Sequence, residues 1–170
     1  WTEVADMSTV KRGQATTGTY TSALACSGDA GPGGTTANVE SWNGSSWTEI
    51  ANVNTGRRNT AGAGADNTTG LVFGGSVVPG NTTRTTTEEY DGSNWATGGA
   101  LNNATLNASG GGTQSAGLKF GGGPPENSTI TSTENYDGSS WTTGTNMGTL
   151  RRQSAGVGSQ TAALAAGGRT

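Results

Sequence analysis

Short apolar runs bounded by Gly, Asn, Ser and Thr recur along the chain, which is typical of β-strands separated by turns. The clearest run covers Leu71–Phe73 and is followed by paired glycines, and related runs begin at Leu24, Leu118 and Leu164. A run of small residues precedes each of them, and no segment keeps apolar residues at helical spacing. The pattern therefore predicts an all-β chain.

The aromatic residues indicate that these strands belong to a repeated unit. A typical copy has an opening aromatic residue, then Asn-Gly or Asp-Gly, and a closing tryptophan. The closing residues are Trp1, Trp47, Trp95 and Trp141, and the opening residues are Trp42, Tyr90 and Tyr136. Successive closing tryptophans are 46–48 residues apart. A fixed period of this size indicates a repeat architecture, in which neighbouring units stack and bury area that no single unit could bury.

Each repeat is predicted to contain four strands. The run of small residues supplies the first strand, where glycine lets another backbone come close, and the Leu run supplies the second. The third and fourth strands meet across Asn-Gly or Asp-Gly, which suits a tight hairpin because both central residues can adopt positive φ. The predicted organisation is the last strand of one unit at 1–5, complete units at 6–50, 51–98 and 99–144, and the first two strands of a further unit at 145–170.

Charged residues also recur at fixed places in the repeat. Glutamates precede the opening aromatic residue by two positions, and double-basic pairs follow the closing tryptophan in three of the four copies. The glutamates are Glu40, Glu88 and Glu134, and the second basic residues are Arg12, Arg58 and Arg152. The copy without a basic pair has Thr105-Leu106. Because residues that recur in every unit serve the scaffold, we expect the glutamates to be hydrogen bonded or paired with an arginine of the repeat.

The succession of Gly-Gly, Glu-x-Tyr-Asp and Trp, with arginine opening the next unit, resembles the kelch repeat of β-propellers over essentially the whole chain. This resemblance implies four-stranded antiparallel blades around an axis. Propellers close with about four to eight blades, so the strands predicted here suggest an incomplete arc of a larger propeller. Repeats of 46–48 residues rich in Gly, Thr, Ser and Asn are also similar to kelch-like repeats in structural proteins of marine bacteriophages.

Composition and charge exclude several classes of protein. Only 29% of the residues are hydrophobic and 31 are glycine, but the repeated aromatic residues argue against disorder. The net charge is −3 and the basic residues are scattered along the sequence, so no electrostatic footprint for nucleic acid is expected. No apolar run approaches the roughly 20 residues of a membrane span, so membrane insertion is not expected.

The sequence offers little for catalysis. There is no histidine, which removes the commonest general base and metal ligand; the copper site of kelch-type oxidases has histidine ligands and is not carried over. Glu88, Glu89 and Glu134 could act as paired carboxylates of a glycosidase, while Asp91 and Asp137 could bind calcium. Glu88 and Glu134 recur at a scaffold position, Asp91 and Asp137 lie in turns, and an active site normally needs an asymmetric set of residues from different repeats. We therefore predict no catalytic residue, metal site or cofactor.

The single cysteine has a simple interpretation. Cys26 aligns with Phe73 and Phe120 at the end of the apolar strand. A small buried core residue is therefore expected there, in preference to a reactive or intermolecular thiol.

The connections between second and third strands differ from repeat to repeat. They emerge on the same face as the connections between units, while the opposite face carries the Asp-Gly turns. Variable loops on a rigid scaffold are where binding usually resides. The candidate binding residues are Asp29, Pro32, Val78, Pro79, Asn81, Arg84, Pro124, Pro125, Glu126 and Asn127.

These observations lead to a functional hypothesis. The expected function is a non-catalytic structural or adhesion module of a bacteriophage virion, in a tail fibre, spike or capsid-surface protein. Its partners would be a host surface glycan, other virion proteins or further copies of itself. Two alternatives stay open: a polysaccharide lyase or glycosidase, and an intracellular kelch-type protein-interaction module.

Overall fold

The computed structural model describes residues 2–32, 34–123 and 128–170. The predicted residues Trp1, Pro124, Pro125, Glu126 and Asn127 lie outside the described residues. All regular structure in the described part of the chain is β-structure, which confirms the all-β prediction. In these ranges there is no helix that could cross a membrane.

The strands form a succession of antiparallel sheets, one for each sequence repeat. Sheet I contains β1 (Ala15–Thr19), β2 (Ser22–Cys26), β3 (Val39–Trp42) and β4 (Trp47–Ile50). Sheet II contains β5 (Ala61–Ala63), β6 (Gly70–Phe73), β9 (Thr87–Tyr90) and β10 (Trp95–Thr97). Sheet III contains β11 (Ser109–Thr113), β12 (Ala116–Phe120), β13 (Thr133–Tyr136) and β14 (Trp141–Thr143). The pair β15 (Ala155–Gly158) and β16 (Ala163–Ala166), called sheet IV here, completes the series.

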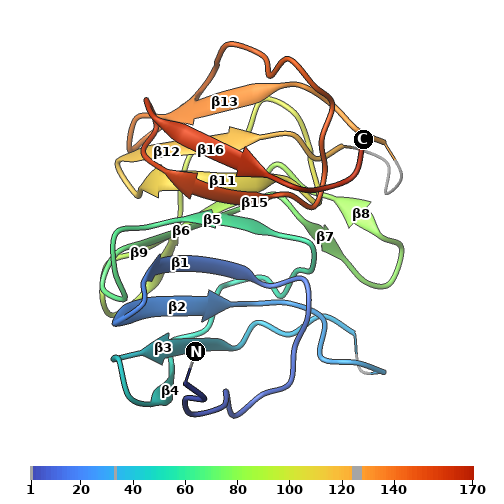
Figure 1. Cartoon of the computed structure of the whole chain (residues 1–170). Helices are drawn as coiled ribbons and strands as arrows, with labels where there is room; N and C mark the ends of the chain where they lie inside the picture. Colours follow the sequence, from blue (N-terminus) through green and yellow to red (C-terminus); the bar gives the residue numbers. More distant parts are fainter. Residues whose placement is uncertain (1, 33, 124–127) are drawn as a thin grey trace.

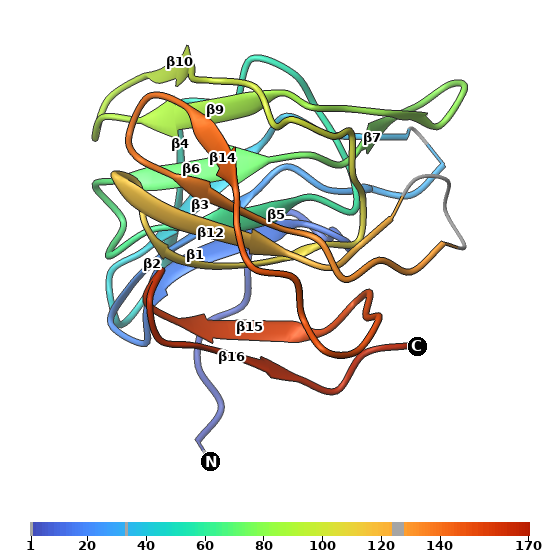
Figure 2. The same ribbon diagram turned by 90° about the horizontal axis from the view of Figure 1, so that it is seen from above.

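The sheets stack side by side like the blades of a propeller, with the first strand of each innermost (Figures 1 and 2). Backbone hydrogen bonds join these inner strands directly, from the Gly18 amide to the Gly64 carbonyl and from the Gly64 amide to the Gly112 carbonyl. A Cβ added at Gly110 would lie only 2.2 Å from the carbonyl oxygen of Gly62. The predicted reason for small residues in the first strand, close approach of another backbone, is therefore confirmed.

Two apolar clusters fill the spaces between sheets. The cluster between sheets I and II contains Ala15, Leu24, Cys26, Val39, Val53, Val72, Tyr90 and Trp95. The cluster between sheets II and III contains Ala61, Ala63, Leu71, Phe73, Leu101, Tyr136 and Trp141. Trp95 and Trp141 thus pack against the preceding sheet, as the edge-on contact of Trp141 with Phe73, at a ring-centroid distance of 4.8 Å, shows for the second of them.

The tryptophans are not equivalent in burial, however. Trp95 and Trp141 are 7% and 5% exposed, whereas Trp47 is only half-buried. Trp47 occupies the corresponding place on sheet I, whose outer face no described sheet covers. Its described contact is with Trp42, at a ring distance of 5.2 Å. Trp95 and Trp141 therefore belong to the core between sheets, whereas Trp47 does not.

Three details differ from the predictions. Residues 2–5 form no strand, because no described strand lies beside them to complete a hydrogen-bonded ladder. The second predicted loop contains a short hairpin, β7 (Ser76–Val77) with β8 (Thr82–Thr83), which projects from the sheets at the right of Figure 1. The third difference lies in the turns between third and fourth strands.

Those turns are four-residue connections and not two-residue hairpins. Tyr90 pairs directly with Trp95, which leaves Asp91 to Asn94 as the loop, and Gly92 alone has positive φ there. The Asp91 carboxylate accepts hydrogen bonds from the backbone N–H groups two and three residues ahead. This side-chain capping replaces the left-handed conformation that a two-residue turn would need at both positions.

Candidate functional site

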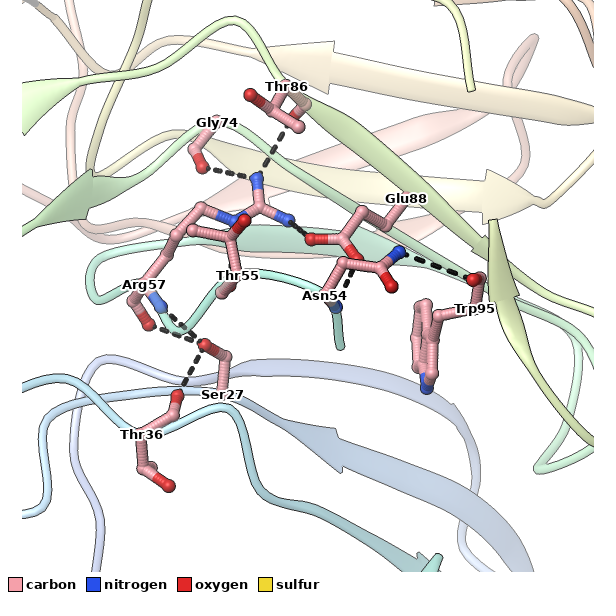
Figure 3. A network of polar contacts seen from close by, with 9 residues as sticks. All are labelled: Ser27, Thr36, Asn54, Thr55, Arg57, Gly74, Thr86, Glu88 and Trp95. Atoms are coloured by element: carbon pink, nitrogen blue, oxygen red, sulfur yellow. Dashed lines mark hydrogen bonds and ion pairs between the residues drawn. The ribbon is translucent and has the colours of Figure 1, made fainter. Parts of the chain in front are cut away.

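A buried glutamate anchors the connection that enters sheet II. Glu88 on β9 is 1% exposed and accepts a 2.9 Å ion-pair hydrogen bond from the Arg57 guanidinium (Figure 3). Its other oxygen accepts the Asn54 backbone N–H, so one carboxylate holds two points of the connecting loop. Arg57 also donates to the carbonyls of Gly74 and Thr86, which satisfies its buried guanidinium. Burial lowers the pKa of Arg57, and Glu88 opposes that shift.

The same arrangement occurs in sheets I and III with different cations. In sheet I, Lys11 lies 3.4 Å from Glu40, whose carboxylate also accepts the Ser8 backbone N–H. In sheet III, Thr105 occupies the position of the basic residue. The cation comes instead from Lys119 on β12, whose Nζ lies 4.0 Å from the carboxylate of Glu134. Burial lowers the pKa of Lys119, against the attraction of Glu134.

These contacts support the structural role predicted for the glutamates but correct the identity of their partners. The cations that pair are Lys11 and Arg57, the first members of the double-basic steps. Arg12, Arg58 and Arg152, which the sequence suggested, line a different part of the molecule. Successive side chains of an extended segment point to opposite sides, so only one member of each pair can face the buried glutamate.

Other predicted scaffold residues lie in structural positions. Cys26 is fully buried in the cluster between sheets I and II, and burial raises the pKa of its thiol to about 12. Asp137 caps its turn through the backbone N–H groups of Ser139 and Ser140. Within the described ranges no group of acidic residues and cysteine could hold a metal ion.

A polar hollow of about 490 Å³ opens at the centre of the loop-bearing face. Its described lining residues are Arg12, Gly13, Asp29, Arg58, Asn59, Asn107, Arg152, Gln153 and Arg169. They occupy three equivalent positions of successive repeats: the second basic residue, the residue after it, and the residue after the paired glycines, which in the first repeat are replaced by Ser27-Gly28. The repeat therefore gathers arginines that lie far apart in the sequence, which corrects the impression of scattered basic residues.

Backbone geometry explains how this ring of residues forms. Gly13, Asn59, Asn107 and Gln153 all have left-handed backbones, with φ between 55° and 62°. The backbone carbonyl of Asn59 accepts a hydrogen bond from the backbone N–H of Asn107, and the backbone carbonyl of Asn107 accepts one from the backbone N–H of Gln153. These turns are therefore bonded to the next repeat. Left-handed φ is uncommon for residues other than glycine, and here it is held by bonds between repeats.

The variable loops of sheets I and II meet beside the hollow. Asp29 accepts hydrogen bonds from Arg12 at 3.1 Å and from Arg58 at 3.4 Å. The Gly31 backbone N–H and these arginines lower the pKa of Asp29. Asn81 on the β7–β8 hairpin accepts a 2.7 Å hydrogen bond from Arg58.

Five of the candidate loop residues thus come together. Pro32, Val78 and Pro79 border a second hollow of about 480 Å³. Arg12, Asp29 and Arg58 line both this hollow and the first one. Arg84 lies apart from both hollows and joins the fold through its backbone, which pairs with Thr105. The sequence therefore located the loop face, but it did not identify Asn59, Asn107, Gln153 or Arg169. Their positions next to the basic pairs and the paired glycines were the signal that could have found them.

Comparison with known proteins gives information on the fold. No protein-family model and no curated protein matches this sequence. Among solved structures, the chain is similar to the "Structure of YjhT", with a TM-score of 0.69 and 14% sequence identity. The match covers 82% of this chain and 47% of that chain, so this chain spans about half the length of that structure. At this identity the similarity shows a common propeller-like fold alone.

Proposed function

We propose that this chain is part of a kelch-like β-propeller and acts as a non-catalytic recognition module of a bacteriophage virion, in a tail fibre, spike or capsid-surface protein. The kelch and virion elements of this proposal rest on the sequence resemblance. Recognition of a host surface glycan or another virion protein would take place on the loop-bearing face.

The convergence of loops from different repeats carries the proposal. Pro32 from sheet I and Val78 from sheet II border one hollow, although 46 residues separate them. On the opposite face, short turns are closed by their own side chains, as in the capping by Asp91. Of the candidate catalytic carboxylates, Glu88 and Glu134 are 1% exposed and engaged with connecting loops. The third, Glu89, is half-buried and accepts a hydrogen bond from the Tyr136 hydroxyl, so all three are held by the scaffold, which favours recognition over hydrolysis.

Binding can be tested with the 170-residue chain displayed in several copies on a carrier, because multivalency makes weak contacts measurable. The displayed chain would be applied to an array of bacterial surface polysaccharides to detect glycan binding. In a second experiment, an antibody against the chain would be applied to phage particles to detect the chain in the virion. Val78→Asp changes the loop face, while Tyr20→Asp is a matched change at a residue that is 92% exposed in the β1–β2 turn.

Binding that Val78→Asp weakens and Tyr20→Asp retains, with equal melting temperatures, would support the proposal. Two results would overturn it: cleavage of a polysaccharide by the chain, or absence of both glycan binding and particle labelling.

A further inference from the structure

Sheet IV presents a strand edge that is covered in the other three sheets. In sheets I, II and III the second strand pairs with a third strand. In the described ranges β16, the second strand of sheet IV, pairs with β15 alone. An open strand edge is a template for an added strand, which binds through main-chain hydrogen bonds. The groups around β16 indicate the chemistry of the strand that would fit.

Arg151 is oriented for a carboxylate at this edge. It occupies the position of Arg57, and its guanidinium donates a 2.6 Å hydrogen bond to the carbonyl of Gly167, the first of the paired glycines. Arg57 donates to the equivalent carbonyl of Gly74 and continues to Glu88 on the third strand (Figure 3). Among the described residues, no carboxylate forms an ion pair with Arg151. The arginine of sheet IV therefore adopts the arrangement of sheet II without its glutamate.

The backbone N–H of Gly148 supplies a second donor for the same carboxylate. In sheets I to III, the other oxygen of the glutamate accepts the backbone N–H of the residue seven positions after the closing tryptophan, which is Ser8, Asn54 or Asn102. Gly148 occupies this position in the connection to sheet IV. A Cβ added at Gly148 would meet no atom within 4 Å, so there is open space beside it. Arg151 and Gly148 thus reproduce both ends of the carboxylate site.

Two apolar side chains indicate that an aromatic residue would accompany the carboxylate. Leu118 on β12 is half-buried, whereas its equivalent Leu71 is fully buried in a cluster with Tyr136 of the next sheet. Met147 is also half-buried, whereas its equivalent Leu101 is 3% exposed in the same cluster. Alternate residues of a strand share a face. An aromatic residue two positions after the glutamate would therefore cover this apolar surface between sheets III and IV.

We propose that the edge of β16 binds an extended segment of a different polypeptide, in which a glutamate precedes an aromatic residue by two positions. The glutamate pairs with Arg151 and Gly148, and the aromatic residue packs on Leu118 and Met147. Main-chain hydrogen bonds along β16 supply affinity, and the charged hydrogen bonds to the glutamate fix the register.

The partner is a different polypeptide because the segments of this chain with the same pattern are already used. They are β3, β9 and β13, each of which pairs on both sides within its own sheet. The inference goes beyond the proposed function, since neither Arg151 nor Gly148 is among the described lining residues of the two hollows on the loop-bearing face.

A synthetic peptide with the sequence of residues 131–144 is the probe, because it contains both outer strands of sheet III, β13 and β14. Titration of the 170-residue chain with this peptide, followed by NMR, should shift the amide signals of β16. The matched peptide carries Glu134→Gln, a change that leaves the folding of the chain itself untouched. We expect it to bind about tenfold more weakly, as is usual when a hydrogen bond to a charged group is lost.

Arg151→Gln in the chain completes a double-mutant cycle with the two peptides. Against this variant the two peptides should bind with affinities within about twofold of each other, because the carboxylate no longer meets a cation. Arg84→Gln is the control, since Arg84 is an exposed arginine in the connection between β8 and β9 of sheet II. It should keep the full difference between the peptides, and melting temperatures would check that both variants fold.

Three results would overturn the inference: no binding of the first peptide, signal shifts away from β16, or a preference for glutamate that persists in Arg151→Gln. Oligomers of the chain alone that Arg151→Gln dissociates would identify a second copy as the occupant and would equally overturn it. Arg151→Gln should leave glycan binding on the array unchanged, so failure of the proposed function and failure of this inference are distinguishable.

Discussion

Lys119 lies directly opposite Glu134 across β12 and β13, and its ammonium nitrogen is 4.0 Å from the carboxylate. In sheet II the residue aligned with Lys119 is Val72, and Arg57 from the connecting loop supplies the cation for Glu88. The fold therefore requires a buried cation beside this glutamate but accepts it from two places in the backbone. Sheet III has Thr105 where sheet II has Arg57, and Lys119 where sheet II has Val72. Together these two differences exchange one source of the buried cation for another.

This relationship can be tested by transplanting the pair of sheet III into sheet II. Arg57→Thr alone leaves the carboxylate of Glu88 buried without its cation, which typically costs about 3–5 kcal/mol of unfolding free energy. Adding Val72→Lys should recover a measurable part of that loss in urea unfolding. The single variant Val72→Lys, which adds a second cation, is the control and should be destabilised. If the double variant is less stable than Arg57→Thr, the two positions are not interchangeable.

Trp95 is expected to be among the most sensitive positions. It packs between sheets I and II, and its indole N–H donates a 2.9 Å hydrogen bond to the Ala51 carbonyl. Trp95→Ala should lower the unfolding free energy by about 3–5 kcal/mol, because it opens a cavity in the core. Trp47→Ala makes the same chemical change at a half-buried position, so its loss in thermal or urea unfolding should be clearly smaller. Equal losses of unfolding free energy would contradict the difference in packing described for Trp95 and Trp47.

Gly110→Ala should act through the backbone of the neighbouring sheet. The added methyl carbon would lie 2.2 Å from the Gly62 carbonyl oxygen, which no side-chain rotation can relieve. We expect a loss of about 1–3 kcal/mol, the usual cost of overpacking. Gly148→Ala is the control, since a methyl group there would meet no atom within 4 Å. Chemical denaturation of the two variants side by side measures the difference.

Asp137 should contribute to the acid sensitivity of the chain. Hydrogen bonds from Ser140 and Ser139 lower its pKa from 3.8 to about 2, so the folded state favours the ionised form. The stabilisation is present above pH 3.8 and is lost as the pH falls through about 2. Asp137→Asn keeps an acceptor oxygen, as Asn43 does in sheet I, but removes the titration. Its unfolding free energy should therefore fall less steeply in this window.

A second variant separates charge from hydrogen bonding at this turn. Asp137→Ala removes the acceptor itself and should already be less stable than Asp137→Asn at pH 7. If Asp137→Asn shows the same pH profile as the wild type, the carboxylate does not contribute as described.

The sequence predicted the four strands of each complete sheet, but not the partners of each charge. The fixed spacing of Trp47, Trp95 and Trp141 predicted the unit, since each begins the fourth strand of its sheet. Pairing of Glu88 with Arg57 in preference to Arg58 depends on which way each side chain points, and a composition pattern does not contain that information. Likewise, Arg12, Arg58 and Arg152 line one hollow only because the inner strands place equivalent turns of successive repeats around one axis.

The two ways of balancing the buried glutamate also constrain how such repeats can diverge. A chain that first exchanges its arginine for threonine, as at Thr105, passes through a state with an uncompensated buried carboxylate. A chain that first acquires the lysine, as at Lys119, passes through a state with two cations around one anion. Because both intermediates are expected to be less stable than either end point, an evolving lineage passes through a less stable protein whichever substitution comes first. Neighbouring repeats of one chain therefore preserve alternative solutions that single substitutions do not readily interconvert.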